Sequence, residues 1–316
     1  MPCVSYVVTV YNKVPVLPFL LAGLAAQQGD FSREFIFVDD GSTDDSGALL
    51  RRLTAGWQAV TIVSQANGGP AVAFNAGLRR ARGDYIKPMD ADDVLLPWGT
   101  RRLLDAIEAT GCAVAFGLPT PTYDIASTPE AVLSVFPHRP GPVERCDNMI
   151  RRSLRGAQTN PSTWLARADA VRRSGGCDER VFIQDYSLEL RLAALGGFAC
   201  LHEMIVRGPA AAPGRLNDNQ AQILHDVNRA LAYFIADHPG LPPGLARRAF
   251  ARAASRAWRW ARRHGGKGLA SPEFRRFCGA RLGLLAATHA NLLATCGAFA
   301  ETNTIRVPAV ARTILA

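Results

Sequence analysis

Residues 85 to 93 read Tyr85-Ile86-Lys87-Pro88-Met89-Asp90-Ala91-Asp92-Asp93, a mostly apolar run that ends in three carboxylates. This pattern predicts a strand whose tip delivers Asp90 and Asp92 to one side of a cleft. Residues two apart on an extended segment point the same way, so both carboxylates can face one ion. Two carboxylates that close repel each other unless a cation lies between them. The alternative is a solvated turn, which this tetrapeptide taken alone would favour.

The carboxylates predict a hard divalent cation. Mg²⁺ and Mn²⁺ prefer oxygen ligands and commonly share phosphate oxygens with a bound nucleotide. We therefore expect Mg²⁺ or Mn²⁺ as the cofactor, in a site that holds a nucleoside diphosphate.

Composition limits the class of protein. Of the 316 residues 48% are hydrophobic, which is enough for a substantial core. The seven cysteines are odd in number, scattered and without a Cys-x-x-Cys, so we expect neither a disulfide framework nor a zinc site. We expect the protein to be in the reducing cytosol. The chain starts with a strand pattern at Val4–Val10 instead of a signal peptide, and polar residues interrupt the apolar run 282–300, so no membrane-spanning helix is expected.

The charge is concentrated in one segment. The formal net charge is +9, and residues 245–281 hold eleven Lys or Arg against one acid, Glu273, or +10. The rest of the chain is close to neutral, so we do not expect a nucleic-acid partner.

Strands and helices alternate along the first part of the chain. Apolar strand patterns lie at 4–10, 35–38, 60–63, 85–89 and 113–116, with helical patterns between them. Strict alternation builds a parallel sheet with helices on both faces. Ligands bind such sheets at the carboxyl ends of the strands, and polar or acidic residues follow Val10, Val38, Val63 and Met89.

The second part of the chain divides the protein into two predicted domains. Residues 119–142 read as a loop-rich insertion, while 163–166 and 198–206 read as further strands. An Ala/Pro linker follows at 209–213, and the sequence then becomes helical and basic. We predict a catalytic domain at 1–213 and a helical extension at 214–316.

Five stretches together resemble the family 2 glycosyltransferases, which have the GT-A, Rossmann-like nucleotide-sugar-binding fold. They are Val4–Asn12, Val38-Asp39-Asp40-Gly41-Ser42-Thr43-Asp44, Asn67-Gly68-Gly69 with Asn75-Ala76-Gly77-Leu78, Gly83–Asp93, and Gln184-Asp185-Tyr186-Ser187-Leu188-Glu189-Leu190-Arg191-Leu192. Their order and spacing match the family over roughly residues 4–206. The resemblance implies a mainly parallel α/β sheet flanked by helices.

The resemblance also implies a role for each site residue. Around the nucleotide, Thr9 and Tyr11 would border it, Asp39 would accept a hydrogen bond from the base, and Asn67 and Gly68 would lie near the base and ribose. Asp90 would lie by the ribose. Asp92 would bind the metal, and Asp185 would be the general base. The implied reaction is inverting transfer from a nucleotide sugar, with a UDP-sugar as the first expectation. The acceptor would be a carbohydrate or a lipid-linked compound, in the synthesis of a polysaccharide or glycoconjugate.

Three positions depart from the family pattern. Gln184 stands where the family usually has an acid, so Asp185 alone is assigned as base, with a helix N-cap as its alternative role. Phe74 stands where an Arg is common, which puts one phosphate contact in doubt. Pro88 cannot donate to a ladder, so we expect the strand to leave the sheet there. Arg191 is assigned a structural role, and Arg215 and Asn219 are candidates for a loop over the diphosphate.

Two rival functions remain at this point. A metal-dependent nucleotidyltransferase would usually carry a Gly/Arg/Lys-rich loop after the first strand, where this chain has Tyr11-Asn12-Lys13. A non-catalytic scaffold that binds sugar nucleotide or partners has Gln184 as its support.

The basic segment 245–281 also has two interpretations. Arg248, Arg252, Arg256, Arg259 and Arg263 fall on one helical face. Either this stripe is solvated while the opposite face packs on the protein, which we favour, or it meets anionic lipid headgroups on the inner face of the membrane with Trp258 and Trp260 at the interface.

Overall fold

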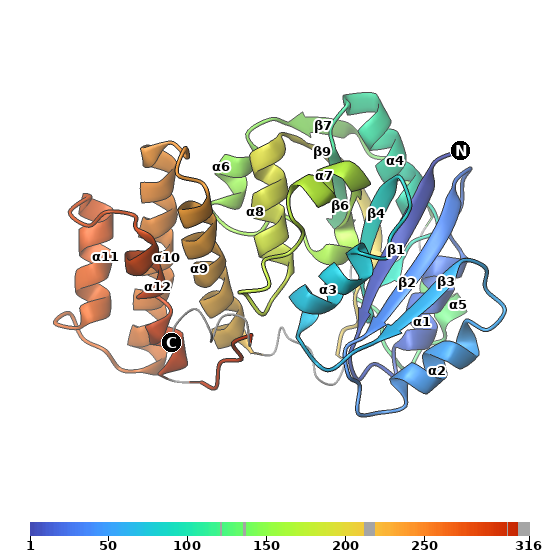
Figure 1. Ribbon diagram of the computed structural model, residues 1–316, viewed down its shortest axis with the longest axis horizontal. Coiled ribbons are helices and arrows are strands. Elements are labelled where there is room, and N and C mark those ends of the chain that lie inside the picture. The colour runs from blue at the N-terminus through green and yellow to red at the C-terminus, as the bar shows by residue number, and fades with distance from the viewer. Residues whose placement is uncertain (121, 135–136, 212–218, 302, 309–316) are drawn as a thin grey trace. The chain divides into compact units, whose positions relative to one another are not determined.

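The structure is a computed structural model that describes residues 1–120, 122–134, 137–211, 219–301 and 303–308 (Figure 1). The chain divides into two compact units. The first comprises Met1–Met149, Thr159–Cys177 and Leu192–Gly214, and the second comprises Ile150–Gln158, Asp178–Arg191 and Arg215–Ala316. The second unit thus takes in two short segments that precede the predicted boundary at 214.

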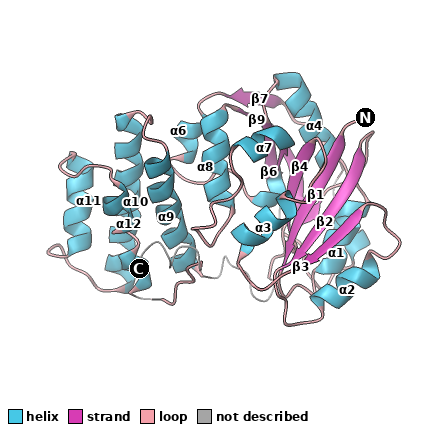
Figure 2. Ribbon diagram, viewed as in Figure 1, coloured by secondary structure: helices cyan, strands magenta, loops and turns pink. Residues whose placement is uncertain are grey.

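The first unit is built on one mixed sheet (Figure 2). Its strands are β1 (Cys3–Val10), β2 (Ser32–Asp39), β3 (Val60–Ser64), β4 (Tyr85–Asp90), β5 (Val94–Leu95), β6 (Val114–Pro119), β7 (Val143–Cys146), β8 (Trp164–Arg167) and β9 (Phe198–Arg207). Their order is β3-β2-β1-β4-β8-β6-β9-β5, with β7 beside β9. The helices of this unit are α1 (Leu17–Ala25), α2 (Ser46–Leu53), α3 (Pro70–Leu78), α4 (Gly99–Thr110), α5 (Pro129–Ser134), the 3₁₀ turn η1 (Pro161–Thr163) and α7 (Ala168–Arg173).

The sheet is mainly parallel, as predicted, because β3, β2, β1 and β4 run in one direction. The strand β8 is the exception beside these four, because it is antiparallel to both β4 and β6. The strand predicted at 163–166 does return to the sheet, where it separates β4 from β6. The insertion predicted as loops contains the short helix α5.

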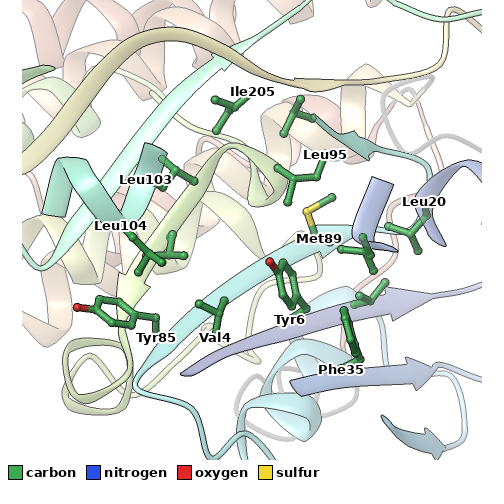
Figure 3. Close-up of a cluster of buried hydrophobic side chains, with 14 of the residues drawn as sticks. Val4, Tyr6, Leu20, Phe35, Tyr85, Met89, Leu95, Leu103, Leu104 and Ile205 are labelled. Carbon is green, nitrogen blue, oxygen red and sulfur yellow. The ribbon is translucent and has the colours of Figure 1, made fainter. Parts of the chain in front are cut away.

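Each face of the parallel strands is buried under helices. Val4, Tyr6, Val8 and Val10 of β1 join a core cluster with residues of α1 and α4 (Figure 3). On the other face, a Cβ added to Gly77 of α3 would lie 2.5 Å from Val7, so α3 packs there at close range. Burial on both faces explains why these strands read as continuous apolar runs. The same packing fixes where their carboxyl ends lie.

The second unit is helical. It contains α6 (Met149–Ser153), the start of α8 (Asp185–Leu195), α9 (Gln220–Asp237), α10 (Pro243–His264), α11 (Pro272–Leu282), α12 (His289–Leu293) and α13 (Gly297–Ala300). Trp258 packs on Phe274 and Trp260 on Phe299, with ring centroids 4.9 and 5.8 Å apart. The interpretation that places both tryptophans at a membrane interface was therefore wrong, because both indoles are buried in the core. No described helix is long and apolar enough to cross a bilayer.

Candidate functional site

The candidate site lies at the carboxyl ends of β2, β1 and β4. The parallel register pairs Val10 with Asp39 on one side of β1 and Thr9 with Asp90 on the other. Asp39 and Asp90 therefore end the two strands that flank β1. Neighbouring strands lie about 4.8 Å apart, which places these two backbones roughly 10 Å from each other.

The acidic tip after β4 is a turn. The strand ends at Asp90, and the N–H of Asp93 donates to the carbonyl oxygen of Asp90 at 3.1 Å. The argument from an extended segment was therefore wrong for Asp92, which lies beyond the strand. The turn is not a solvated one, since the Asp92 side chain is 15% exposed and pairs with Lys13 Nζ at 2.6 Å. The Tyr123 hydroxyl also donates to the Asp92 carbonyl oxygen at 2.9 Å.

Pro88 remains inside the sheet, contrary to the prediction that the strand leaves there. Its register partner on β1 is Val7, and pairing with β1 continues to Asp90. On the other side, β4 pairs with β8 only at Tyr85 and Ile86. No described strand there would accept a hydrogen bond from residue 88, so the lack of a backbone N–H in Pro88 costs nothing. Ser162 replaces the ladder there, because its hydroxyl accepts from the Asp90 N–H at 3.0 Å.

Lys87 is a buried cation behind this tip. Its Nζ donates to the carbonyl oxygens of Pro88 at 2.9 Å and Ser162 at 2.6 Å, which ties β4 to η1. Burial lowers the pKa of Lys87 to about 7, although Asp93 and Asp90 act to raise it. The sequence did not predict that Lys87 joins these two elements.

The loop after β1 is fixed to the loop after β2. Asn12 adopts a left-handed conformation, with φ of 53°, and its side-chain oxygen accepts from the Thr43 N–H at 2.8 Å. The Asn12 N–H donates to the Ser42 hydroxyl at 3.0 Å. These bonds place Lys13 next to Asp92, while Tyr11 remains exposed and Thr9 is half-buried. The Tyr11 ring is thus accessible to a ligand at this edge.

The loop after β2 holds the loop after β3. The buried Asp40 carboxylate accepts from the N–H groups of Gly68 and Gly69 at 2.9 and 2.8 Å. The Asn67 side chain donates to the Asp40 carbonyl oxygen at 2.9 Å. Burial raises the pKa of Asp40, against the effect of its hydrogen bonds to Gly68, Gln65 and Gly69. Asp40 therefore fixes the backbone conformation of the loop that carries the predicted residues Asn67 and Gly68.

Asp39 points toward the start of α2. One carboxylate oxygen accepts from the Ser42 N–H at 3.0 Å, and the other lies 2.5 Å from where a Cβ of Gly47 would be. Glycine at 47 is thus what allows this carboxylate to lie against the helix.

Asp185 lies in the second unit, as the first residue of α8. Its carboxylate accepts from the Tyr186 N–H at 2.7 Å. Burial raises the pKa of Asp185, and the nearby Asp226 raises it further, while the hydrogen bond from Tyr186 lowers it. A carboxylate with a raised pKa is a stronger base than an ordinary one.

The remaining residues singled out in the sequence have structural surroundings. Arg191 pairs with Asp178 at 3.1 Å, in agreement with a structural role. Phe74 is buried in the core, so the position where the family often has Arg offers no cation here. Asn219 caps α9 by accepting from the Gln222 N–H at 3.1 Å, and Arg215 lies outside the described residues.

The donor set at this edge suits a cation that is shared with a ligand. In the described part of the chain, no three His, Cys, Asp or Glu side chains gather closely enough to hold a metal together. Mg²⁺ is usually bound by one or two carboxylates together with substrate phosphates and water. Asp92, with Asp90 beside it, fits that arrangement and does not fit an all-protein cage.

Comparison with known proteins gives a family for the first part of the chain and a fold for most of it. Residues 5–143 match the family described as Glycosyl transferase family 2. The succinoglycan biosynthesis protein ExoO of Rhizobium meliloti (strain 1021) is 33% identical over 114 residues, 36% of this chain and 32% of ExoO. An undecaprenyl-phosphate 4-deoxy-4-formamido-L-arabinose transferase of Pseudomonas fluorescens (strain SBW25) is 40% identical over 94 residues, 28% of each chain. The matches thus span about a third of these relatives.

Solved structures match over nearly the whole chain. The S. aureus TarS 1–349 complex with UDP-GlcNAc has a TM-score of 0.64 and 16% identity over 97% of this chain and 93% of that one. A mannosyltransferase, PcManGT from Pyrobaculum calidifontis, in complex with GDP-Man and Mn²⁺, has a TM-score of 0.53 and 20% identity over 95% and 86%. At these identities the likeness shows the fold alone.

Proposed function

Because residues 5–143 form a glycosyl transferase family 2 domain, we propose that this chain moves a sugar from a nucleoside-diphosphate sugar to an acceptor hydroxyl, with inversion at the anomeric carbon. One observation supports this most: the strand register that puts Asp39 and Asp90 on either side of β1, with the Asp92–Lys13 pair on the loops beyond. This edge of the sheet presents carboxylates and the Lys13 ammonium group together, which suits a ligand that carries a base, a ribose and a diphosphate.

On the donor side, the exposed Tyr11 ring packs on the base with Thr9 beneath it, and Asp39 accepts a hydrogen bond from the base. Asn67 and Gly68 contact base and ribose on the backbone that Asp40 shapes. Asp90 holds the ribose.

On the diphosphate side, Asp92 holds Mg²⁺ or Mn²⁺. A divalent cation, when bound, offsets the charge that develops on the leaving diphosphate. Lys13, now paired with Asp92 at 2.6 Å, supplies a second positive charge at the same place.

On the acceptor side, Asp185 removes the proton from the attacking hydroxyl. A hydroxyl is a poor nucleophile until its proton is taken by a group within hydrogen-bond reach. One base and one in-line attack give inversion without a covalent sugar intermediate.

The names of related proteins guide the choice of substrates. UDP-GlcNAc and GDP-Man are bound by two structural neighbours, and one relative is named as an undecaprenyl-phosphate sugar transferase. We therefore propose a UDP-sugar as the first donor to test, a GDP-sugar as the second, and a carbohydrate or lipid-linked acceptor in polysaccharide or glycoconjugate synthesis.

A thermal-shift panel of UDP-, GDP- and dTDP-sugars, each with and without Mn²⁺, tests the donor. We expect one nucleotide to raise the unfolding temperature, and more so with Mn²⁺, since binding to the folded state alone stabilises it. A panel in which no nucleotide raises the unfolding temperature would contradict the proposal.

The substitution Asp185→Asn tests the base. We expect transfer or hydrolysis of the donor to fall by a factor of about 10² to 10⁴ while donor binding is unchanged. Full activity in this variant would refute the assignment of Asp185, and a wild-type chain that binds donor but transfers nothing would favour a binding scaffold.

A further inference from the structure

Arg256, on α10 of the second unit, is half-buried, and one nitrogen of its guanidinium group is fully buried. Its Nε donates to the Asn228 side-chain oxygen at 2.9 Å. Its Nη2 is buried and has no hydrogen-bond partner within the described residues. Burial lowers the pKa of Arg256, but an arginine remains protonated at neutral pH. Leaving a charged donor buried and unsatisfied is costly, so the position calls for an explanation.

Among the residues that the structure describes, no carboxylate pairs with Arg256. The groups that act on it are Tyr186, Arg252, Arg259 and Cys296. Burial raises the pKa of the Cys296 thiol to about 12, and it raises the pKa of the Tyr186 phenol as well, so both are neutral at pH 7. The two arginines add positive charge and lower the pKa of Arg256 further.

The carboxylates that act on the neighbours of Arg256 have hydrogen-bond donors of their own. Glu189, which acts on Tyr186, accepts from the Ser153 hydroxyl and from the Gln158 N–H. Asp226, which acts on Cys296, accepts from the Ile183 N–H at 3.0 Å and from the Gln222 side chain at 2.9 Å. Within the described residues, neither carboxylate forms a hydrogen bond or an ion pair with Arg256.

Arg252 and Arg259 stand one helical turn before and after Arg256, on the same face of α10. Both are exposed, and their hydrogen bonds are weak ones to backbone oxygens. Arg252 donates to the Arg155 carbonyl at 3.5 Å, and Arg259 donates to the Ser255 carbonyl at 3.3 Å. A solvated stripe accounts for these two side chains, but it does not account for the buried Nη2 of Arg256 between them.

We propose that Arg252, Arg256 and Arg259 bind a phosphate ester. The planar guanidinium fork matches the oxygens of phosphate bidentately, and a phosphate group can accept from several arginines at once. The phosphate can belong to a soluble compound or to a lipid headgroup. The proposal concerns the second unit alone and does not depend on the transfer reaction.

Titration calorimetry of the full chain with inorganic phosphate and glycerol 3-phosphate tests the proposal with soluble ligands. We expect binding that falls at least about tenfold in Arg256→Gln and in Arg252→Gln. The second variant changes an exposed side chain, so it reports on the site even where Arg256→Gln does not fold. Arg275→Gln, on the exposed side of α11, removes the same charge and should change the affinity less than twofold.

Sedimentation with phosphatidylglycerol and phosphatidylcholine vesicles identifies the source of the phosphate. Binding of glycerol 3-phosphate supports a soluble ester. Binding only to phosphatidylglycerol vesicles, lost in Arg252→Gln and kept in Arg275→Gln, supports a lipid headgroup. The proposal is overturned if the wild-type chain binds neither the soluble phosphates nor the vesicles, or if Arg275→Gln weakens binding as much as Arg252→Gln does. No arm uses a sugar nucleotide, so failure here leaves the proposed transfer unaffected.

Discussion

At the scale of single residues, Lys87 is a charged side chain placed where water cannot reach it. A buried ammonium group is tolerated only when its donors are used, and the carbonyl oxygens of Pro88 and Ser162 accept from it. Through Ser162, which also holds the Asp90 N–H, the lysine supports the tip of β4. The residue therefore links the packing of the strand to the position of a candidate site residue.

The titration of Lys87 predicts a pH dependence of stability. Its pKa in the folded chain is about 7, whereas an unfolded lysine titrates near 10.4. Between these values the unfolded chain binds more protons, so the free energy of unfolding rises with pH, by up to about 1.4 kcal/mol per pH unit. Lys87→Met should remove this rise. Urea unfolding of both proteins at pH 7, 8 and 9 measures it, and equal slopes would disprove the assignment.

The surroundings of Asp185 predict how the transfer rate depends on pH. Its pKa is raised by burial and by Asp226, and a general base acts only when deprotonated. The transfer rate should therefore begin to fall, as pH is lowered, at a pH above the ordinary pKa of aspartate, about 3.9. A kcat profile from pH 4 to 8 with saturating donor tests this. A rate that stays constant down to pH 4 would show that Asp185 is not the base or is not shifted.

At the scale of elements, the site is made by loops that bind one another. Gly41 shows how tightly two of them meet, because its φ is +74° and an added Cβ would lie 2.8 Å from the Asn67 backbone nitrogen. Only glycine adopts this conformation readily and leaves room for the second loop.

The substitution Gly41→Ala should therefore destabilise the chain by roughly 1 to 3 kcal/mol and weaken nucleotide binding. Gly56→Ala is the matched control, since no atom lies within 4 Å of its added Cβ. Its effect should stay within about 0.5 kcal/mol. Chemical unfolding of both variants decides, and a Gly41→Ala protein as stable as the control would contradict the packing of the two loops.

The sequence predicted those elements whose signal is local. The apolar β-branched runs of β1, β2 and β3 and the helices between them follow from periodicity alone. The antiparallel direction of β8 does not follow from its sequence, because it depends on the place of β8 between β4 and β6 in the sheet. The two-residue β5 is too short for a pattern, and its partner β9 lies more than a hundred residues later. The Asp90–Asp93 turn was the alternative to the strand tip, and an acidic run has no period that could decide between the two.

The same distinction holds for the site. Asp39 and Asp90 stand at the ends of apolar strand patterns, so their position could be predicted, whereas the extended segment expected for Asp92 was wrong. Asp40, Lys13 and Ser162 could not be predicted, because their roles depend on partners in other loops. The pair Asp39-Asp40 was a signal for Asp40, but a turn explains a second Asp at this position equally well.

At the scale of the whole molecule, residues 178–191 belong with the C-terminal helices. Arg180 pairs with Asp237, its carbonyl oxygen accepts from the Arg229 Nε at 3.0 Å, and the Ile183 N–H donates to Asp226. These partners all lie on α9. The segment that carries Asp185 thus depends on residues beyond 213 for its contacts.

A chain shortened to residues 1–213 should consequently lose order around Asp185. We expect rapid proteolytic cleavage within 178–191 in the shortened chain and resistance there in the full chain. Transfer should be lost with it. Equal resistance of this segment in both chains would contradict the dependence on α9.

The most direct test of the account is calorimetric binding of the nucleoside diphosphate that stabilises the chain best, with and without Mn²⁺. If Asp92 holds a cation shared with the diphosphate, Mn²⁺ should raise the affinity at least about tenfold in the wild-type chain. The same gain should appear in Asp169→Asn, a change of an exposed acid in α7, and it should be absent in Asp92→Asn. A gain from Mn²⁺ that persists in Asp92→Asn, or no nucleotide binding in the wild-type chain, would contradict it.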